Sequence, residues 1–64
     1  MSLWGEAALV VVGVWARWPS LDAKQMKKAI EQVQKETRGR SMNILKVQQL
    51  LAEKVAELYG PPTA

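Results

Sequence analysis

The chain has 64 residues, of which 48% are hydrophobic and 23% charged, and a net charge of +3. One domain of this size buries only about 60% of the surface that its unfolded chain exposes, so its core is marginal by itself. The chain contains neither cysteine nor histidine. This excludes disulfides, thiolate metal sites and a thiol nucleophile, and it removes the commonest general base. We expect a single domain over residues 1–60, a frayed tail over 61–64, stabilisation by self-association, and a reducing, cytoplasmic location.

The first segment, residues 3–18, is almost entirely apolar. Its uncharged run of ten residues is too short to cross a bilayer, which takes about 20. Its valines and Trp15 are typical of a pleated strand, and Pro19 cannot donate a hydrogen bond to a strand ladder. The composition favours a strand over about 9–17, although periodicity alone does not separate a short apolar run from a buried helix.

A helix is predicted over about residues 20–38. Apolar residues recur there at helical spacing and the remaining positions are mostly charged or polar; the apolar positions are Met26, Ala29, Ile30 and Val33. Ser20 or Asp22 can cap its start, and Asp22 with Gln25 forms a partial capping box. Gly39 favours the end of this helix.

A second helix is predicted over about residues 42–59, with Ser41 and Asn43 as possible N-caps. Its apolar stripe consists of Ile44, Val47, Leu51, Val55 and Leu58. Gly60, followed by two prolines, ends the helix. The predicted fold class is therefore mainly α with one short N-terminal β-strand, in the order β-α-α.

Positive charge is concentrated in the middle of the chain. Residues 17–46 contain eight lysines and arginines against three acids. Lys24, Lys28 and other lysines lie mostly on the polar side of the first predicted helix, and Arg38 and Arg40 lie just before the second. Free N–H groups at the start of a helix favour an anion. We therefore expect phosphate contacts from Lys24, Lys28, Arg38 and Arg40. A basic helix face that is merely solvated is the alternative.

The tryptophans are open to two interpretations. They can stack on bases or lie at a membrane surface, but in an apolar segment they more often belong to a core or a dimer contact. In a strand over 12–18, Gly13, Trp15 and Arg17 would share one face, and Val12, Val14, Ala16 and Trp18 would share the other.

Two short strings, Arg17-Trp18-Pro19 and Gly39-Arg40-Ser41-Met42-Asn43, resemble the ribbon-helix-helix repressors. The resemblance implies that two chains pair their strands into an antiparallel ribbon, which enters the major groove of DNA on an intertwined homodimer. It implies base contacts from Gly13, Trp15 and Arg17. It also implies phosphate contacts at the start of the second helix, where the residues are Arg40, Ser41, Met42 and Asn43.

The sequence thus predicts a small dimeric DNA-binding protein that regulates transcription. The predicted dimer core comprises Val12, Val14, Trp18, Ile30, Val33, Ile44, Val47, Leu51, Val55 and Leu58. The predicted partners are double-stranded DNA and a second copy of the chain, with a further protein as a possible partner. No enzyme motif, cofactor, metal site or small-molecule substrate is predicted. The alternatives are a protein-interaction or oligomerisation module, and a small membrane-associated protein that uses residues 3–18.

Overall fold

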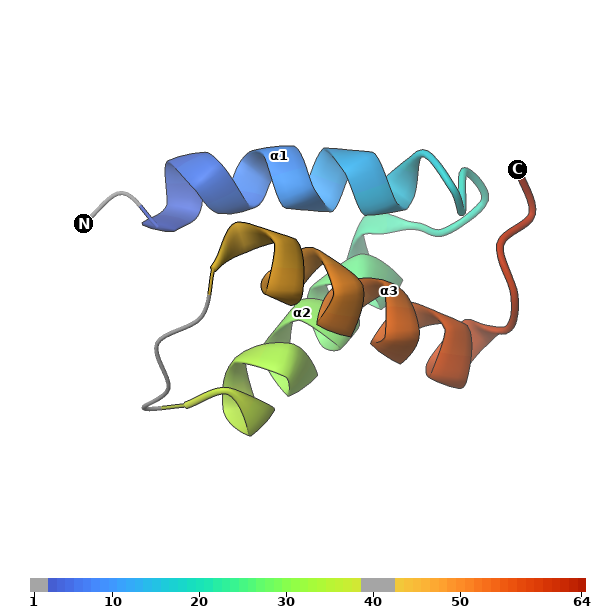
Figure 1. Cartoon of the computed structure of the whole chain (residues 1–64). Coiled ribbons are helices and arrows are strands. Elements are labelled where there is room, and N and C mark those ends of the chain that lie inside the picture. The colour runs from blue at the N-terminus through green and yellow to red at the C-terminus, as the bar shows by residue number, and fades with distance from the viewer. Residues whose placement is uncertain (1–2, 39–42) are drawn as a thin grey trace.

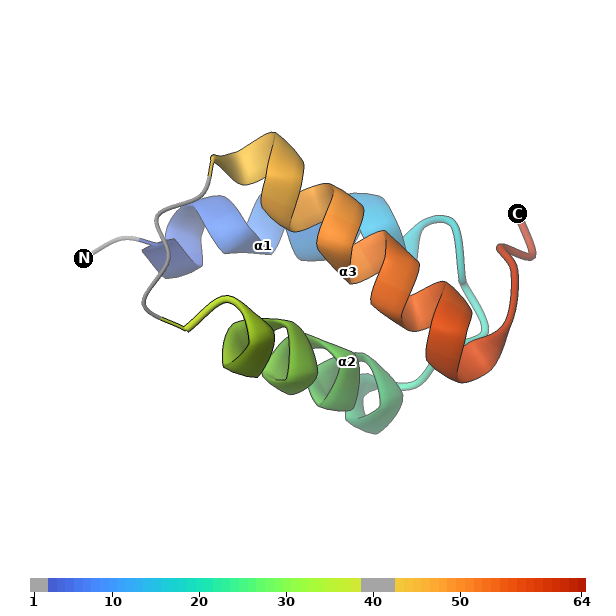
Figure 2. The ribbon, with the colours of Figure 1, turned by 60° about the horizontal axis from the view of Figure 1, so that its bottom comes forward.

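Three helices make up the fold of the described residues. The computed structural model describes the backbone of residues 3–38 and 43–64 and the side chains of residues 8–38 and 43–64. The helices are α1, Leu3–Trp15, α2, Ala23–Glu36, and α3, Ile44–Tyr59 (Figure 1). Both α1 and α2 pack against α3. In both views α2 runs in the opposite general direction to the other two helices (Figures 1 and 2), so the fold is a small three-helix bundle.

The predicted strand over 9–17 is wrong, because this segment lies largely in α1 and no strand occurs in the described part of the chain. The β-α-α ribbon-helix-helix fold is therefore also wrong, and so are the ribbon and the intertwined homodimer built on it. The physical reason is hydrogen bonding. A single strand leaves its N–H and C=O groups without partners, whereas a helix pairs most of them within itself.

A stripe of buried residues runs along one side of α1 and into the turn that follows it, but the apolar residues around it make the stripe hard to recognise in the sequence. Val10, Val14 and Trp18 follow one another at intervals of four residues, and all three are buried, Val14 completely. The indole N–H of Trp18 donates to the carbonyl oxygen of Gly60 at 2.9 Å. The indole N–H of Trp15 donates to the carbonyl oxygen of Leu21, also at 2.9 Å. These bonds tie the end of α1 to the turn before α2 and to the end of α3.

The two helices predicted after Pro19 both form. The first, α2, begins three residues later and ends two residues earlier than predicted. Its capping box is present: the carboxylate of Asp22 accepts from the N–H of Gln25 at 2.8 Å, and the side-chain oxygen of Gln25 accepts from the N–H of Asp22 at 3.0 Å. The hydroxyl of Thr37 closes the other end by donating to the carbonyl oxygen of Val33.

The third helix, α3, begins at Ile44, two residues later than predicted, and ends at Tyr59 as predicted. The side-chain oxygen of Asn43 accepts from the N–H of Lys46 at 2.8 Å, so Asn43 is its N-cap. Gly60 ends the helix with a φ of 96°, a backbone conformation that residues other than glycine rarely adopt. The hydroxyl of Tyr59 donates to the carbonyl oxygen of Gln25, which joins the end of α3 to the start of α2.

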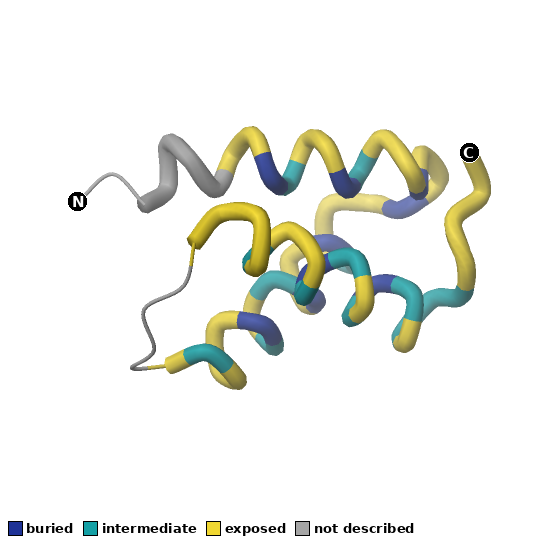
Figure 3. The backbone as a smooth tube through the Cα atoms, in the orientation of Figure 1, coloured by how far each residue is buried: buried dark blue, intermediate teal, exposed yellow. Residues whose placement is uncertain are grey.

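The core lies where the three helices converge. Its buried residues are all hydrophobic: Val10, Val14, Trp18, Leu21, Met26, Ala29, Val33, Leu51 and Val55. The residues after α3 contact the turn that follows α1, because the N–H groups of Thr63 and Ala64 donate to the carbonyl oxygen of Arg17. Figure 3 shows exposed positions along the side of α1 that faces away from the other two helices.

Candidate nucleic-acid interface

The outward side of α2 carries a predominantly positive surface, which we call the basic face. Its cations are exposed and lie on one side of the helix, because the second, third and fourth are three, four and eleven residues from the first; they are Lys24, Lys27, Lys28 and Lys35. One acid, Glu31, lies among them. The opposite side of α2 is held in the core by Met26, Ala29 and Val33, so the lysines must point to solvent.

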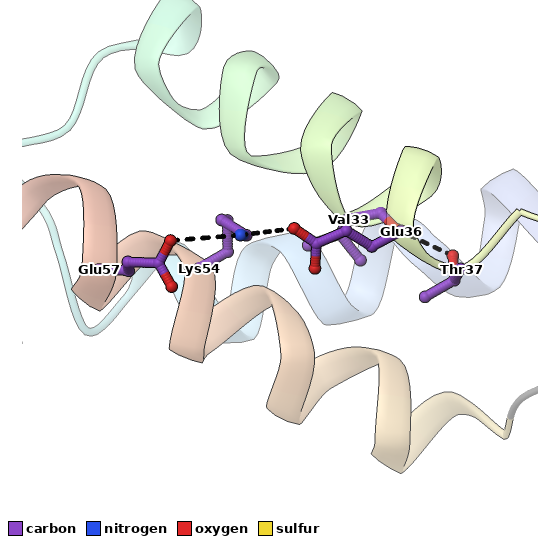
Figure 4. Close-up of polar contacts among 5 residues, drawn as sticks. All are labelled: Val33, Glu36, Thr37, Lys54 and Glu57. Atoms are coloured by element: carbon purple, nitrogen blue, oxygen red, sulfur yellow. Dashed lines mark hydrogen bonds and ion pairs between the residues drawn. The ribbon is translucent and has the colours of Figure 1, made fainter.

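Two acids near the basic face are engaged elsewhere. Asp22 caps the start of α2. Glu36 turns toward α3, where its carboxylate lies 2.6 Å from the ammonium of Lys54, and Glu57 lies 3.4 Å from the same ammonium (Figure 4). The hydrogen bond from Glu36 raises the pKa of Lys54, with Glu57 adding to it against the effect of burial. The positive charge of Lys54 is thus compensated by two carboxylates. On the basic face, in contrast, four lysines lie around one acid, Glu31.

The basic face is long enough to follow a nucleic-acid backbone. Lys24 and Lys35 are eleven residues apart, about 16 Å along a helix axis. Arg38 is exposed just beyond the end of α2 and extends the positive charge in that direction. An open hollow near the middle is lined by lysines and amides, with one carboxylate; these residues are Lys28, Glu31, Gln32, Gln34 and Lys35.

Of the predicted phosphate contacts, Lys24 and Lys28 lie together on the basic face and Arg38 follows it. Asn43 lies at the start of α3, and its side-chain oxygen is engaged in capping. The prediction for Arg40, Ser41 and Met42 falls outside the described residues. Lys27 and Lys35 were absent from the predicted contact set. Their spacing from Lys24 and Lys28 is the signal that places them on the same face.

The predicted base contacts lose their common surface, because they lie in a helix and its following turn rather than on one side of a strand. Gly13 is exposed on α1. Trp15 is half-buried and its N–H is bonded to the carbonyl oxygen of Leu21. Arg17 is exposed, with its guanidinium 5.4 Å from the centroid of the Trp18 ring. The predicted grouping of these three residues is therefore wrong.

The predicted dimer core divides into three groups. Five of its residues are buried within the single chain: Val14, Trp18, Val33, Leu51 and Val55. Three are half-buried against that core: Ile30, Val47 and Leu58. Ile44 is 39% exposed and Val12 is 66% exposed. Val12 therefore does not share a face with Val14 and Trp18, as a strand would have required.

A second surface was missed by sequence reasoning. The outward side of α1, which we call the apolar face, consists of exposed uncharged residues: Ala8, Leu9, Val12, Gly13 and Ala16. Leu9 is 75% exposed, and Leu45 at the start of α3 is 71% exposed. Because both sides of α1 are apolar, its sequence does not separate the inward stripe from the outward one.

Comparison with protein-family models, curated proteins and solved structures finds no significant match to this chain. Two short strings resemble the ribbon-helix-helix repressors, but the fold that this resemblance implied is not formed in the described residues. Among the described residues, none of the helices has the combination of length and hydrophobicity needed to span a bilayer.

Proposed function

We propose that this protein is a small, non-enzymatic DNA-binding protein that contacts the phosphates of a duplex through the basic face of α2. The observation that carries the proposal is the alignment of four exposed lysines on one helix side, with a single glutamate among them. Lysine binds phosphate as a point charge. Phosphate contacts position a protein on DNA without reading its sequence, so the proposed binding is independent of sequence.

The size of the basic face matches its proposed ligand. Each strand of duplex DNA carries about one negative charge per 3.4 Å of axis, so the roughly 16 Å between Lys24 and Lys35 spans about five phosphates of one strand. Not all cations reach a phosphate at once, and we expect three to five contacts from the lysines and Arg38. The chain has no cysteine, which is compatible with a reducing compartment, and a cytoplasmic location is part of this proposal.

The test is a fluorescence-anisotropy titration of a labelled duplex at about 50 and 200 mM salt. Each phosphate contact contributes about −0.9 to the slope of log affinity against log salt concentration. Three to five contacts therefore predict a loss of affinity of roughly 40- to 500-fold between the two conditions. No binding at the lower salt concentration would refute the proposal.

A matched pair of variants locates the contact. Lys28→Gln removes one charge from the basic face, and Lys46→Gln removes one exposed charge from α3. We expect Lys28→Gln to reduce the salt slope by about 1 on every duplex sequence and Lys46→Gln to leave it nearly unchanged. Equal losses from both variants would mean that net charge, rather than the basic face, is responsible for binding.

A further inference from the structure

The apolar face of α1 has a feature that its own fold does not explain. Gly13 lies in the helix, where glycine is less favourable than alanine. A Cβ built at Gly13 meets no atom within 4 Å. The missing side chain is therefore not needed for packing within the chain, and it leaves a notch on the exposed side of α1, between the large side chains of Leu9 and Val12 and the small one of Ala16.

We propose that the apolar face binds a second copy of this chain, with the two α1 helices antiparallel about a two-fold axis. Leu9, Val12, Gly13 and Ala16 form a stripe that is symmetric about the midpoint between Val12 and Gly13. A two-fold axis at that midpoint sets Val12 of one protomer against Gly13 of its partner, and Leu9 against Ala16. Each large side chain then meets a small one, so the stripe is complementary to itself, as a two-fold interface requires.

Charge also favours a second copy over a lipid surface. The chain has no charged residue between Ala7 and Ala16, so two apolar faces approach without repulsion between like charges. Helices that lie in a membrane interface usually combine an apolar side with a strongly charged side on the same helix. Here the lysines of the basic face belong to α2. Because α1 and α2 bury their inner sides in a common core, their outward sides form different surfaces of the molecule.

The available area predicts a weak dimer. An interface of standard size takes about 800 Å² from each partner, which is about one-sixth of the 4732 Å² that this chain exposes. One helix side supplies only part of that area. Interfaces below the standard size are typical of weak and transient complexes, so we expect a dissociation constant in the micromolar range. This dimer differs from an intertwined one, because each core stays within one chain.

Sedimentation velocity of the full chain, in buffer without DNA and over a range from about 5 to 500 µM that brackets the expected constant, tests association independently of the proposed function. We expect monomers at the low end and dimers at the high end. Leu9→Lys places a charge in the contact and should abolish the dimer, whereas Gln34→Lys adds the same charge to exposed α2 and should not. Far-UV circular dichroism checks that both variants fold. A monomer throughout, or a dimer that survives Leu9→Lys, overturns the proposal.

Gly13→Ala separates association from folding. The added methyl group improves the helix propensity of α1, so the melting temperature measured at low protein concentration should rise. The same methyl group fills the notch that receives Val12 of the partner, so the dissociation constant should increase several-fold. A variant that is more stable and dimerises equally well would contradict the placement of the partner's Val12 against Gly13.

Cross-linking tests the antiparallel arrangement, because the chain has no cysteine of its own. A mixture of Leu9→Cys and Ala16→Cys chains should form a mixed disulfide under mild oxidation. Leu9→Cys alone should not, since the two copies of position 9 would be separated by seven residues, about 10 Å along the axis, beyond the reach of a disulfide. Efficient cross-linking of Leu9→Cys to itself would overturn the antiparallel pairing.

Discussion

Helices α1 and α2 are similar in length and both bury one side in the same core, yet their outward sides are opposite in character. The outward side of α2 carries lysines, whereas that of α1 carries leucine, valine, glycine and alanine. Water solvates the charged side chains of the basic face, so this face does not have to be covered by another protein. The apolar face of α1 exposes Leu9 and Val12 to solvent, and a contiguous exposed apolar patch of this kind is characteristic of an interaction site. The comparison teaches that one core can support two surfaces of opposite chemical character.

The largest expected effect concerns the core that the two helices share. Met26 of α2 is 1% exposed, and Met26→Ala should destabilise the fold by about 2–5 kcal/mol through lost burial and the cavity left behind. Leu9→Ala is the control from the outward side of α1, and it should change the free energy of unfolding by less than about 0.5 kcal/mol. Urea denaturation at low protein concentration measures both values. Equal losses would show that Leu9 is not on an outward side.

The next effect concerns the start of α2. Asp22→Ala removes the acceptor of the Gln25 N–H and breaks the capping box, which should cost about 1 kcal/mol. The matched variant Asn43→Ala removes the cap of α3 and should cost a similar amount. Thermal unfolding of both variants compares the two helix starts, and an unchanged melting temperature for Asp22→Ala would contradict the observed cap.

Gly13→Ala should have a smaller and opposite effect, stabilising the monomer by about 0.5–1 kcal/mol, because the new methyl group meets no atom of its own chain. Ala29→Gly is the reverse change at a fully buried position of α2, and it should destabilise the fold by at least as much. Chemical denaturation at low protein concentration measures whether each variant raises or lowers the free energy of unfolding. A destabilising Gly13→Ala would place Gly13 against another part of the chain.

The smallest effect concerns the ion pair between α2 and α3. The pKa of Lys54 is raised above the ordinary value of 10.5, mainly by its hydrogen bond to Glu36. Lys54 therefore stays protonated to higher pH in the folded chain than in the unfolded chain. The pair therefore stabilises the fold below pH 10.5, and this contribution is lost as pH rises through the raised pKa. Glu36→Gln removes the main partner. Melting temperatures from neutral to strongly alkaline pH should show a shallower alkaline decline for this variant, and parallel curves would exclude the linkage.

The difference between α1 and α2 also explains what the sequence could predict. In α2, charged and apolar residues alternate with the helical period, so the helix, its capping box and its inward residues Met26, Ala29 and Val33 could be read directly. In α1, residues on both sides are apolar, so the period that links Val10, Val14 and Trp18 is hidden. β-Branched composition then favoured a strand, which the packing of the whole chain overrides.

The same reasoning applies to the candidate sites. Lys24 and Lys28 could be placed on a polar helix side because their helix was predicted correctly. Gly13, Trp15 and Arg17 were grouped by the two-residue period of a strand, and that grouping failed with the strand. The exposure of Leu9 and Val12 depends on which side of α1 meets α3, and this depends on tertiary contacts that no local pattern contains.

The most direct test of the account is a titration of the isotopically labelled protein with a DNA duplex at low salt, followed by amide chemical shifts in NMR spectra. The account predicts that the largest changes occur at the basic face, from Lys24 to Lys35 and at Arg38, with little change from Leu9 to Ala16. Changes centred on α1, or no changes at all, would contradict it.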